Sequence, residues 1–117
     1  TMLSSEQLVT LLAGIERTFS RSIRGLPTSV ETSPATASVE RLRVLAGFGV
    51  ERVSIGVQSF IDEEAHRIGR PQQLKKVHRA LEAIRAAGFP VLNIDLIYGD
   101  PSQTRESWRA SLREALT

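Results

Sequence analysis

The stretch RVSIGVQSF, residues 52–60, constrains the fold more than any other part of this chain. Side chains alternate between the two faces of a β-strand. One face of such a strand would carry the aliphatic side chains of Val53, Ile55 and Val57. The other face would carry Ser54, Gly56 and Gln58. This second face leaves room and offers hydrogen-bonding groups, so we expect something polar to lie against it.

Two further stretches have the same two-faced pattern. In residues 91–98, an apolar face is formed by Leu92, Ile94, Leu96 and Tyr98, and the opposite face by Asn93 and Asp95. In residues 28–32, Val30 lies opposite Ser29 and Glu31. Three such strands predict a sheet that is covered by helices on one face and curves around a ligand on the other.

Helical periodicity predicts helices between these strands. We expect them at residues 4–19, 37–46, 72–87 and from 104 onward, with one or two helical turns at 62–68. Ser4 and Gln7 have the spacing of an N-terminal capping box. Gly47 and Gly88 are expected to cap the helices at 37–46 and 72–87 in left-handed conformation.

Alternating strands and helices imply parallel strands joined by right-handed crossovers. A doubly wound sheet is covered on both faces and has strands that are apolar throughout. The polar faces here favour an α/β fold that is a segment of a partial (β/α) TIM-type barrel, with a ligand at the carboxyl ends of the strands. We expect residues 1–117 to form a single such segment: a helix at 4–19, then three strand–helix units. Because three strands cannot close a barrel, we also expect the segment to self-associate, by pairing of its open edges or by exchange of a terminal helix.

Composition excludes several classes of protein. The 15 basic and 13 acidic residues are intermixed, which argues against a nucleic-acid partner. No apolar run approaches the roughly 20 residues of a membrane span, and no signal peptide opens the chain. We therefore expect a cytoplasmic protein without membrane contact. The chain has no cysteine, and His66 and His78 are expected on helix surfaces, so we expect no metal ligands within it.

Several motifs resemble one family of proteins. They are RVSIGVQSF at 52–60, Gly69-Arg70, NIDLIYG at 93–99, Ser29-Val30-Glu31 followed by Pro34, and the turn Pro101-Ser102-Gln103-Thr104. In this order and spacing they resemble radical S-adenosylmethionine (SAM) enzymes, in particular the oxygen-independent coproporphyrinogen III oxidase family. The resemblance extends from about residue 28 to the C-terminus.

The resemblance implies a function and cofactors. Such enzymes hold a [4Fe–4S] cluster on a Cys-x-x-x-Cys-x-x-Cys motif, and the cluster reduces SAM to release a 5′-deoxyadenosyl radical. The chain is expected to be a segment of such an oxidoreductase, acting on a small molecule for which a porphyrin is one candidate. Without the cysteines it would be inactive alone. The alternatives are a haem chaperone or methyltransferase of the same family, or a non-catalytic binding domain that has lost the cluster.

The resemblance also implies four cofactor-binding residues, Glu31, Gln58, Arg70 and Asp95, and no catalytic residue. Each has a structural alternative. Glu31 could be an exposed acid at a strand end, and Gln58 an amide that ties a loop to the backbone. An ionised carboxylate in an apolar strand is costly unless it is paired, so Asp95 could instead form a structural pair with Arg70.

Overall fold

The computed structural model describes residues 2–71 and 73–117. Its elements follow in the order α1 (Ser5–Phe19), β1 (Ser29–Thr32), α2 (Val39–Gly47), β2 (Arg52–Gln58), α3 (Asp62–Arg67), α4 (Leu74–Ala86), β3 (Val91–Leu96) and α5 (Arg105–Ala115). None of the helices among these residues has the length and apolar content needed to cross a bilayer.

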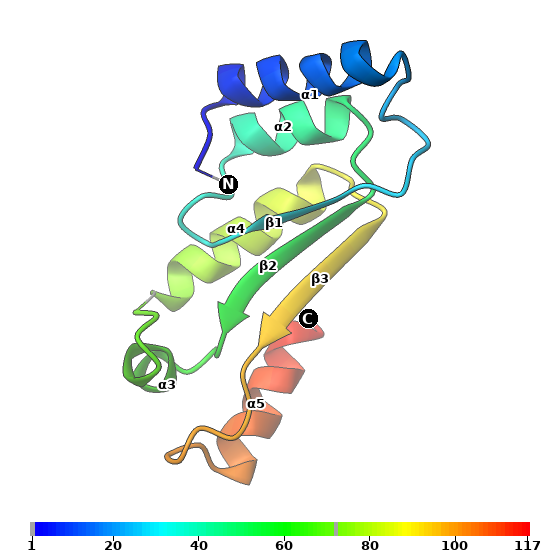
Figure 1. Ribbon diagram of the computed structural model, residues 1–117. Helices are drawn as coiled ribbons and strands as arrows, with labels where there is room; N and C mark the ends of the chain where they lie inside the picture. The colour runs from blue at the N-terminus through cyan, green and yellow to red at the C-terminus, as the bar shows by residue number, and fades with distance from the viewer. Residues whose placement is uncertain (1, 72) are drawn as a thin grey trace.

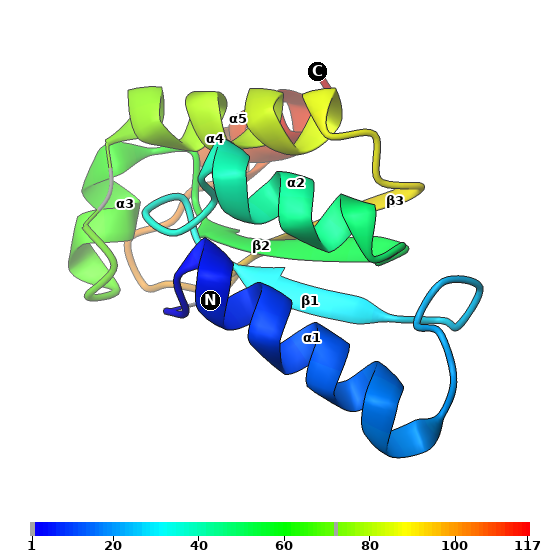
Figure 2. The same ribbon diagram turned by 90° about the horizontal axis from the view of Figure 1, so that it is seen from above.

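The three strands form one parallel sheet in the order β1-β2-β3. Glu31 of β1 lies opposite Ser54 of β2, which in turn lies opposite Asn93 of β3. Helices α2 and α4 lie on the same side of this sheet (Figures 1 and 2). The predicted α/β architecture, with parallel strands that alternate with helices, is therefore confirmed.

The main core lies between the sheet and these two helices. Val53, Ile55 and Val57 of β2 are each 0% exposed. They pack with buried side chains from α2 and α4, among them Leu42, Val77, Leu81 and Ile84. Complete burial of each such side chain stabilises the fold by about 1.5–3 kcal/mol. This burial determines which face of β2 is turned toward the helices.

A second core joins α1 to α2 above the sheet (Figure 1). Its buried members are Leu8, Leu12, Ile23, Leu45 and Val50. The capping box that starts α1 is present: the Gln7 amide nitrogen donates to Ser4 Oγ at 3.2 Å, and the Ser4 amide nitrogen donates to Gln7 Oε1 at 2.8 Å. Both donors would otherwise lack partners at the helix start.

Two predicted details are wrong. Gly47 is the last residue of α2, and the left-handed residue is Gly49, with φ +82°, because Phe48 continues the right-handed conformation for one more residue. Gly88 does adopt φ +75°, as predicted. The third strand ends at Leu96, and Tyr98 lies beyond it with 78% of its surface exposed. Tyr98 leaves the apolar face of the sheet and contacts the ring of Trp108, at a centroid distance of 6.0 Å.

Candidate functional site

The polar face of the sheet is the face turned away from the core. Ser54, Gly56 and Gln58 of β2 alternate with its three buried aliphatic residues. The register places Asp95 of β3 directly opposite Gly56. Parallel pairing therefore brings the polar residues of three separate strands into adjacent positions on one face.

At its carboxyl end β2 departs from regular geometry. The register with β3 shifts between Gly56 and Gln58, which pairs with Leu96, so β2 holds one extra residue there. Gln58 has φ +69°, a left-handed conformation that is unfavourable for residues other than glycine. Such bulges redirect side chains and are frequent beside functional sites.

A cleft of about 1140 Å³ opens at this end of the sheet. Its walls come from the carboxyl half of β1 and the loop after it, the polar face of β2, α3 with the loop that follows it, the start of α4, and Asp95 of β3. The lining residues are Glu31, Thr32, Ser33, Pro34, Ala35, Ser54, Gly56, Gln58, Asp62, Glu63, His66, Arg67, Arg70, Pro71, Gln73, Lys76 and Asp95. All four residues expected to bind the cofactor, Glu31, Gln58, Arg70 and Asp95, line this one cleft.

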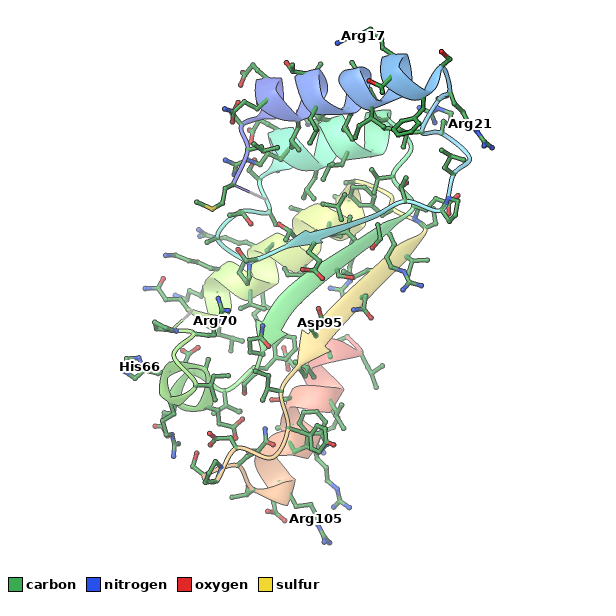
Figure 3. All side chains as sticks on the ribbon, viewed as in Figure 1. Arg17, Arg21, His66, Arg70, Asp95 and Arg105 are labelled. Atoms are coloured by element: carbon green, nitrogen blue, oxygen red, sulfur yellow. The ribbon has the colours of Figure 1, made fainter. Side chains whose placement is uncertain are left out.

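Arg70 and Asp95 reach the cleft from different elements. Arg70 belongs to the loop between α3 and α4, and Asp95 to β3, with the end of β2 between them (Figure 3). Asp95 accepts a hydrogen bond from Asn93 Nδ2 at 2.7 Å. Among the described residues, Arg67 and Glu63 form an ion pair and His78 lies beside Glu114, whereas the alternative of an Arg70–Asp95 ion pair is not observed.

Gly56 leaves room beside it for the side chain of Gln58. A Cβ atom on Gly56 would lie 2.8 Å from Gln58 Nε2, which is closer than real Cβ atoms come to a neighbour. The Gln58 amide therefore occupies the space that the glycine leaves open. The glycine on the polar face thus makes room for a side chain of its own strand.

His66 is exposed, as expected, and lines the cleft. The side chain of His78 is 40% exposed on the surface of α4. It lies against the ring of Phe60, and its Nε2 is 3.4 Å from Glu114 Oε1. No group of three or more potential metal-ligating side chains occurs in the ranges 2–71 and 73–117.

Reasoning from the sequence missed a buried polar cluster beside the cleft. Glu64 of α3 is only 3% exposed and accepts hydrogen bonds from Ser59 Oγ at 2.8 Å and from Gln103 Nε2 at 3.2 Å. Burial disfavours the charged form of this carboxyl, but the nearby Ser107 hydroxyl and the hydrogen bonds from Ser59 and Gln103 outweigh the burial and hold the pKa of Glu64 below its ordinary value. Glu64 is therefore an ionised carboxylate at neutral pH.

Comparison with known proteins identifies the family. A model of the Radical SAM superfamily matches residues 4–115. This chain belongs to the radical SAM superfamily. A heme chaperone, HemW of Bacillus subtilis, is 38% identical over 117 residues, which are 100% of this chain and 31% of that protein. Coproporphyrinogen III oxidase, anaerobic 1, of Cereibacter sphaeroides is 38% identical over 89 residues, 76% of this chain and 20% of that protein.

A solved radical SAM structure has the same fold. Coproporphyrinogen III oxidase HemN of Escherichia coli superposes with a TM-score of 0.84 and 32% sequence identity, over 97% of this chain and 26% of that chain. The three parallel strands therefore correspond to part of the HemN partial barrel, and the chain falls within the HemN/HemW, coproporphyrinogen III oxidase-like, family of radical SAM proteins. The chain spans about a third or less of the length of these relatives.

The family implies two cofactors, and the residues of this radical SAM chain fit only one of them. The cluster requires thiolate ligands, and the chain contains no cysteine. The residues of the cleft suit SAM better, because they include carboxylates (Glu31, Asp95), an amide (Gln58) and a guanidinium (Arg70). The cleft is also larger than typical small-molecule sites, so it has room for a molecule of this size.

Proposed function

We propose that this chain supplies part of the SAM-binding wall of a longer radical SAM oxidoreductase related to coproporphyrinogen III oxidase. One observation carries the proposal: Glu31, Gln58, Arg70 and Asp95, which come from three strands and a loop, line a single cleft. Ligands of α/β barrels bind at the carboxyl ends of the strands. The position of the cleft supports the same assignment.

Each side chain would have a separate role toward SAM. The carboxylates of Glu31 and Asp95 would attract the positively charged methionine part of the molecule. The guanidinium of Arg70 suits a carboxylate. Gln58, which has both a donor and an acceptor, would bind a ribose hydroxyl or the amino acid group. Bound next to an iron–sulfur cluster, SAM is the radical source of such enzymes, and the cluster would be held by residues outside this chain.

A binding titration tests the assignment. SAM is titrated anaerobically into the full-length protein encoded by the gene that carries this sequence, after iron–sulfur reconstitution. We expect Glu31→Gln and Asp95→Asn each to weaken SAM binding about tenfold, since each removes one charge-assisted interaction. Glu82→Gln is the matched control, because Glu82 is exposed on α4 and lies outside the cleft. Wild-type affinity in both cleft variants would contradict the proposal.

A haem chaperone is the second candidate function. The match to HemW of Bacillus subtilis, at 38% identity over the whole of this chain, supports it. Titration of haem into the same protein separates the two candidates: a chaperone binds haem, whereas an oxidase converts coproporphyrinogen III. A porphyrin-type small molecule is the proposed ligand in either case.

The coding sequence upstream of Thr1 separates both candidates from a binding domain that has lost its cluster. Three cysteines spaced Cys-x-x-x-Cys-x-x-Cys favour a radical SAM enzyme, and their absence favours the binding domain. The 117-residue chain alone is expected to produce no 5′-deoxyadenosine from SAM, because it offers no thiolate to a cluster.

A further inference from the structure

Glu64 is a buried charge outside the cleft. It lies on α3 with 3% of its surface exposed, and it is not among the residues that line the cleft. A buried carboxylate is costly unless donors surround it. Its hydrogen bonds lead in two directions, toward the end of β2 and toward the turn between β3 and α5.

The first direction leads to Ser59, the residue after Gln58. Ser59 Oγ donates to Glu64 Oε2 at 2.8 Å and accepts from the Ile61 amide nitrogen at 3.0 Å. Ser59 is itself only 4% exposed. The carboxylate therefore fixes the backbone immediately after the left-handed Gln58.

The second direction leads to Gln103. Gln103 Nε2 donates to Glu64 Oε2 at 3.2 Å and to the Ile97 carbonyl oxygen at 3.3 Å. Gln103 Oε1 accepts from the Gly99 amide nitrogen at 2.9 Å. One amide side chain thus links the buried carboxylate to the backbone that follows β3.

Both sets of hydrogen bonds connect to Gln58. The Ile97 amide nitrogen donates to the Gln58 carbonyl oxygen at 2.8 Å. The connected groups form a closed ring that runs from Gln58 through Ile97, Gln103, Glu64 and Ser59 and back along the chain to Gln58. The ring includes Gln58, the one residue of β2 whose backbone is left-handed.

We propose that Glu64 is a positioning residue for Gln58, and that the ring it closes holds the Gln58 backbone left-handed with its amide in the cleft. The proposal rests on the proposed function, because it requires Gln58 to bind SAM. Loss of the carboxylate would remove one hydrogen bond from Ser59 and one from Gln103. The ring would then be open, and Gln58 could relax to an ordinary conformation. SAM binding would then weaken although Glu64 does not touch the cleft.

A double-mutant cycle in the reconstituted full-length protein tests this role. Its arms are wild type, Glu64→Leu, Gln58→Ala and the double variant, each titrated anaerobically with SAM. We expect Gln58→Ala to weaken binding about tenfold and Glu64→Leu about fivefold. In the double variant, we expect no loss beyond that of Gln58→Ala, because Glu64 acts through Gln58. Glu82→Leu, the same substitution at an exposed position of α4, should bind SAM as wild type does.

Each other outcome overturns a definite part of the proposal. The positioning role is wrong if Glu64→Leu weakens SAM binding by the same factor in the wild-type and the Gln58→Ala background. It is also wrong if Glu64→Leu does not weaken SAM binding at all. In both cases Gln58 remains a SAM ligand. If Gln58→Ala binds SAM as tightly as wild type, the assignment of Gln58 fails and the role of Glu64 fails with it. If Glu64→Leu does not fold, Glu64→Gln replaces it in the same cycle, with an expected loss of about threefold that must also disappear in the Gln58→Ala background.

Discussion

Gly56 and Gln58 are packed so closely that one added methyl group would change the shape of the cleft. The Gln58 amide reaches over Gly56 to within 2.8 Å of the position that a Cβ would occupy. Gln58 also holds an unfavourable backbone conformation, with φ +69°. For L-residues this conformation costs about 1–2 kcal/mol, so the surrounding hydrogen bonds must offset that cost.

The substitution Gly56→Ala is therefore expected to impair SAM binding. The added methyl group would push the Gln58 amide aside, and we expect SAM affinity to fall about threefold to tenfold. Thermal stability should change little, because the obstructing atom is the end of a flexible side chain. Titration and thermal melting of the full-length protein measure the two effects.

Gly47→Ala is the matched control for that substitution. Gly47 ends α2 and has nothing within 4 Å of its Cβ position, so alanine there should leave SAM affinity unchanged. Unchanged SAM affinity in Gly56→Ala would show that the position of the Gln58 amide does not matter for the ligand.

The sequence indicated which face of β2 is polar, but not the conformation of Gln58. Alternation along one strand is local, so Ser54, Gly56 and Gln58 could be placed on one face from residues 52–60 alone. The bulge depends on the register between β2 and β3, which lie more than 30 residues apart in the chain. Glu64 gave no signal either, because α3 has six residues, too few for a periodic pattern to distinguish it from Glu63.

At the scale of elements, the Glu64 cluster joins α3, the end of β2 and α5. Besides the ring around Gln58, the Phe60 amide nitrogen donates to Ser111 Oγ of α5 at 3.3 Å. Ser111 is 1% exposed. Through these polar contacts the cluster connects α5 to the residues that follow β2, whereas α2 and α4 pack on the sheet through apolar side chains.

The cluster predicts a dependence of stability on acid. The pKa of folded Glu64 lies below its ordinary value of 4.5. Its stabilising contribution is therefore fully present above about pH 4.5 and is lost as the pH falls through the folded pKa. We expect Glu64→Gln to lower the free energy of unfolding at pH 7 by about 2 kcal/mol, and this difference from wild type should shrink below pH 4.5.

Urea unfolding of the 117-residue chain at one fixed concentration, between pH 3 and 7, measures the difference. Glu82→Gln, at an exposed position, should remain within about 0.5 kcal/mol of wild type throughout. If the difference in free energy of unfolding between Glu64→Gln and wild type stays constant from pH 7 to pH 3, the charge of the carboxylate contributes nothing to stability.

Element boundaries that depend on local chemistry could be predicted, and those that depend on packing could not. The capping box at Ser4 and the left-handed Gly88 follow from residues adjacent in sequence. Tyr98 continued the apolar alternation of β3, yet it is exposed because the strand ends at Leu96 and the chain turns toward α5. That turn is held by Gln103 and Glu64, a contact across 39 positions of sequence.

At the scale of the whole molecule, the chain is more extended than a compact domain. Its radius of gyration is 15.9 Å, and its extents are 50 × 23 × 22 Å, whereas about 13 Å is expected for a compact domain of this length. Within the described sheet, β1 and β3 each have one unpaired edge. Several large apolar side chains are exposed, including Leu11, Ile15 and Phe19 on α1 and Leu112 and Leu116 near the C-terminus.

The isolated 117-residue chain is therefore expected to self-associate. Open strand edges and exposed apolar surface both favour pairing with a second copy. Gel filtration with light scattering across a dilution series should give a mass that rises above 12.9 kDa with concentration. A monomer with a cooperative melt at every concentration would show that the chain satisfies its own edges.

The most direct test of the SAM site is an anaerobic crystal structure of the full-length protein with its cluster and SAM. We predict that SAM occupies the cleft at the carboxyl ends of β1, β2 and β3, within hydrogen-bonding distance of Gln58 and Asp95 and with Glu31 and Arg70 beside its charged groups. SAM bound elsewhere, with none of these four side chains in contact, would contradict the assignment.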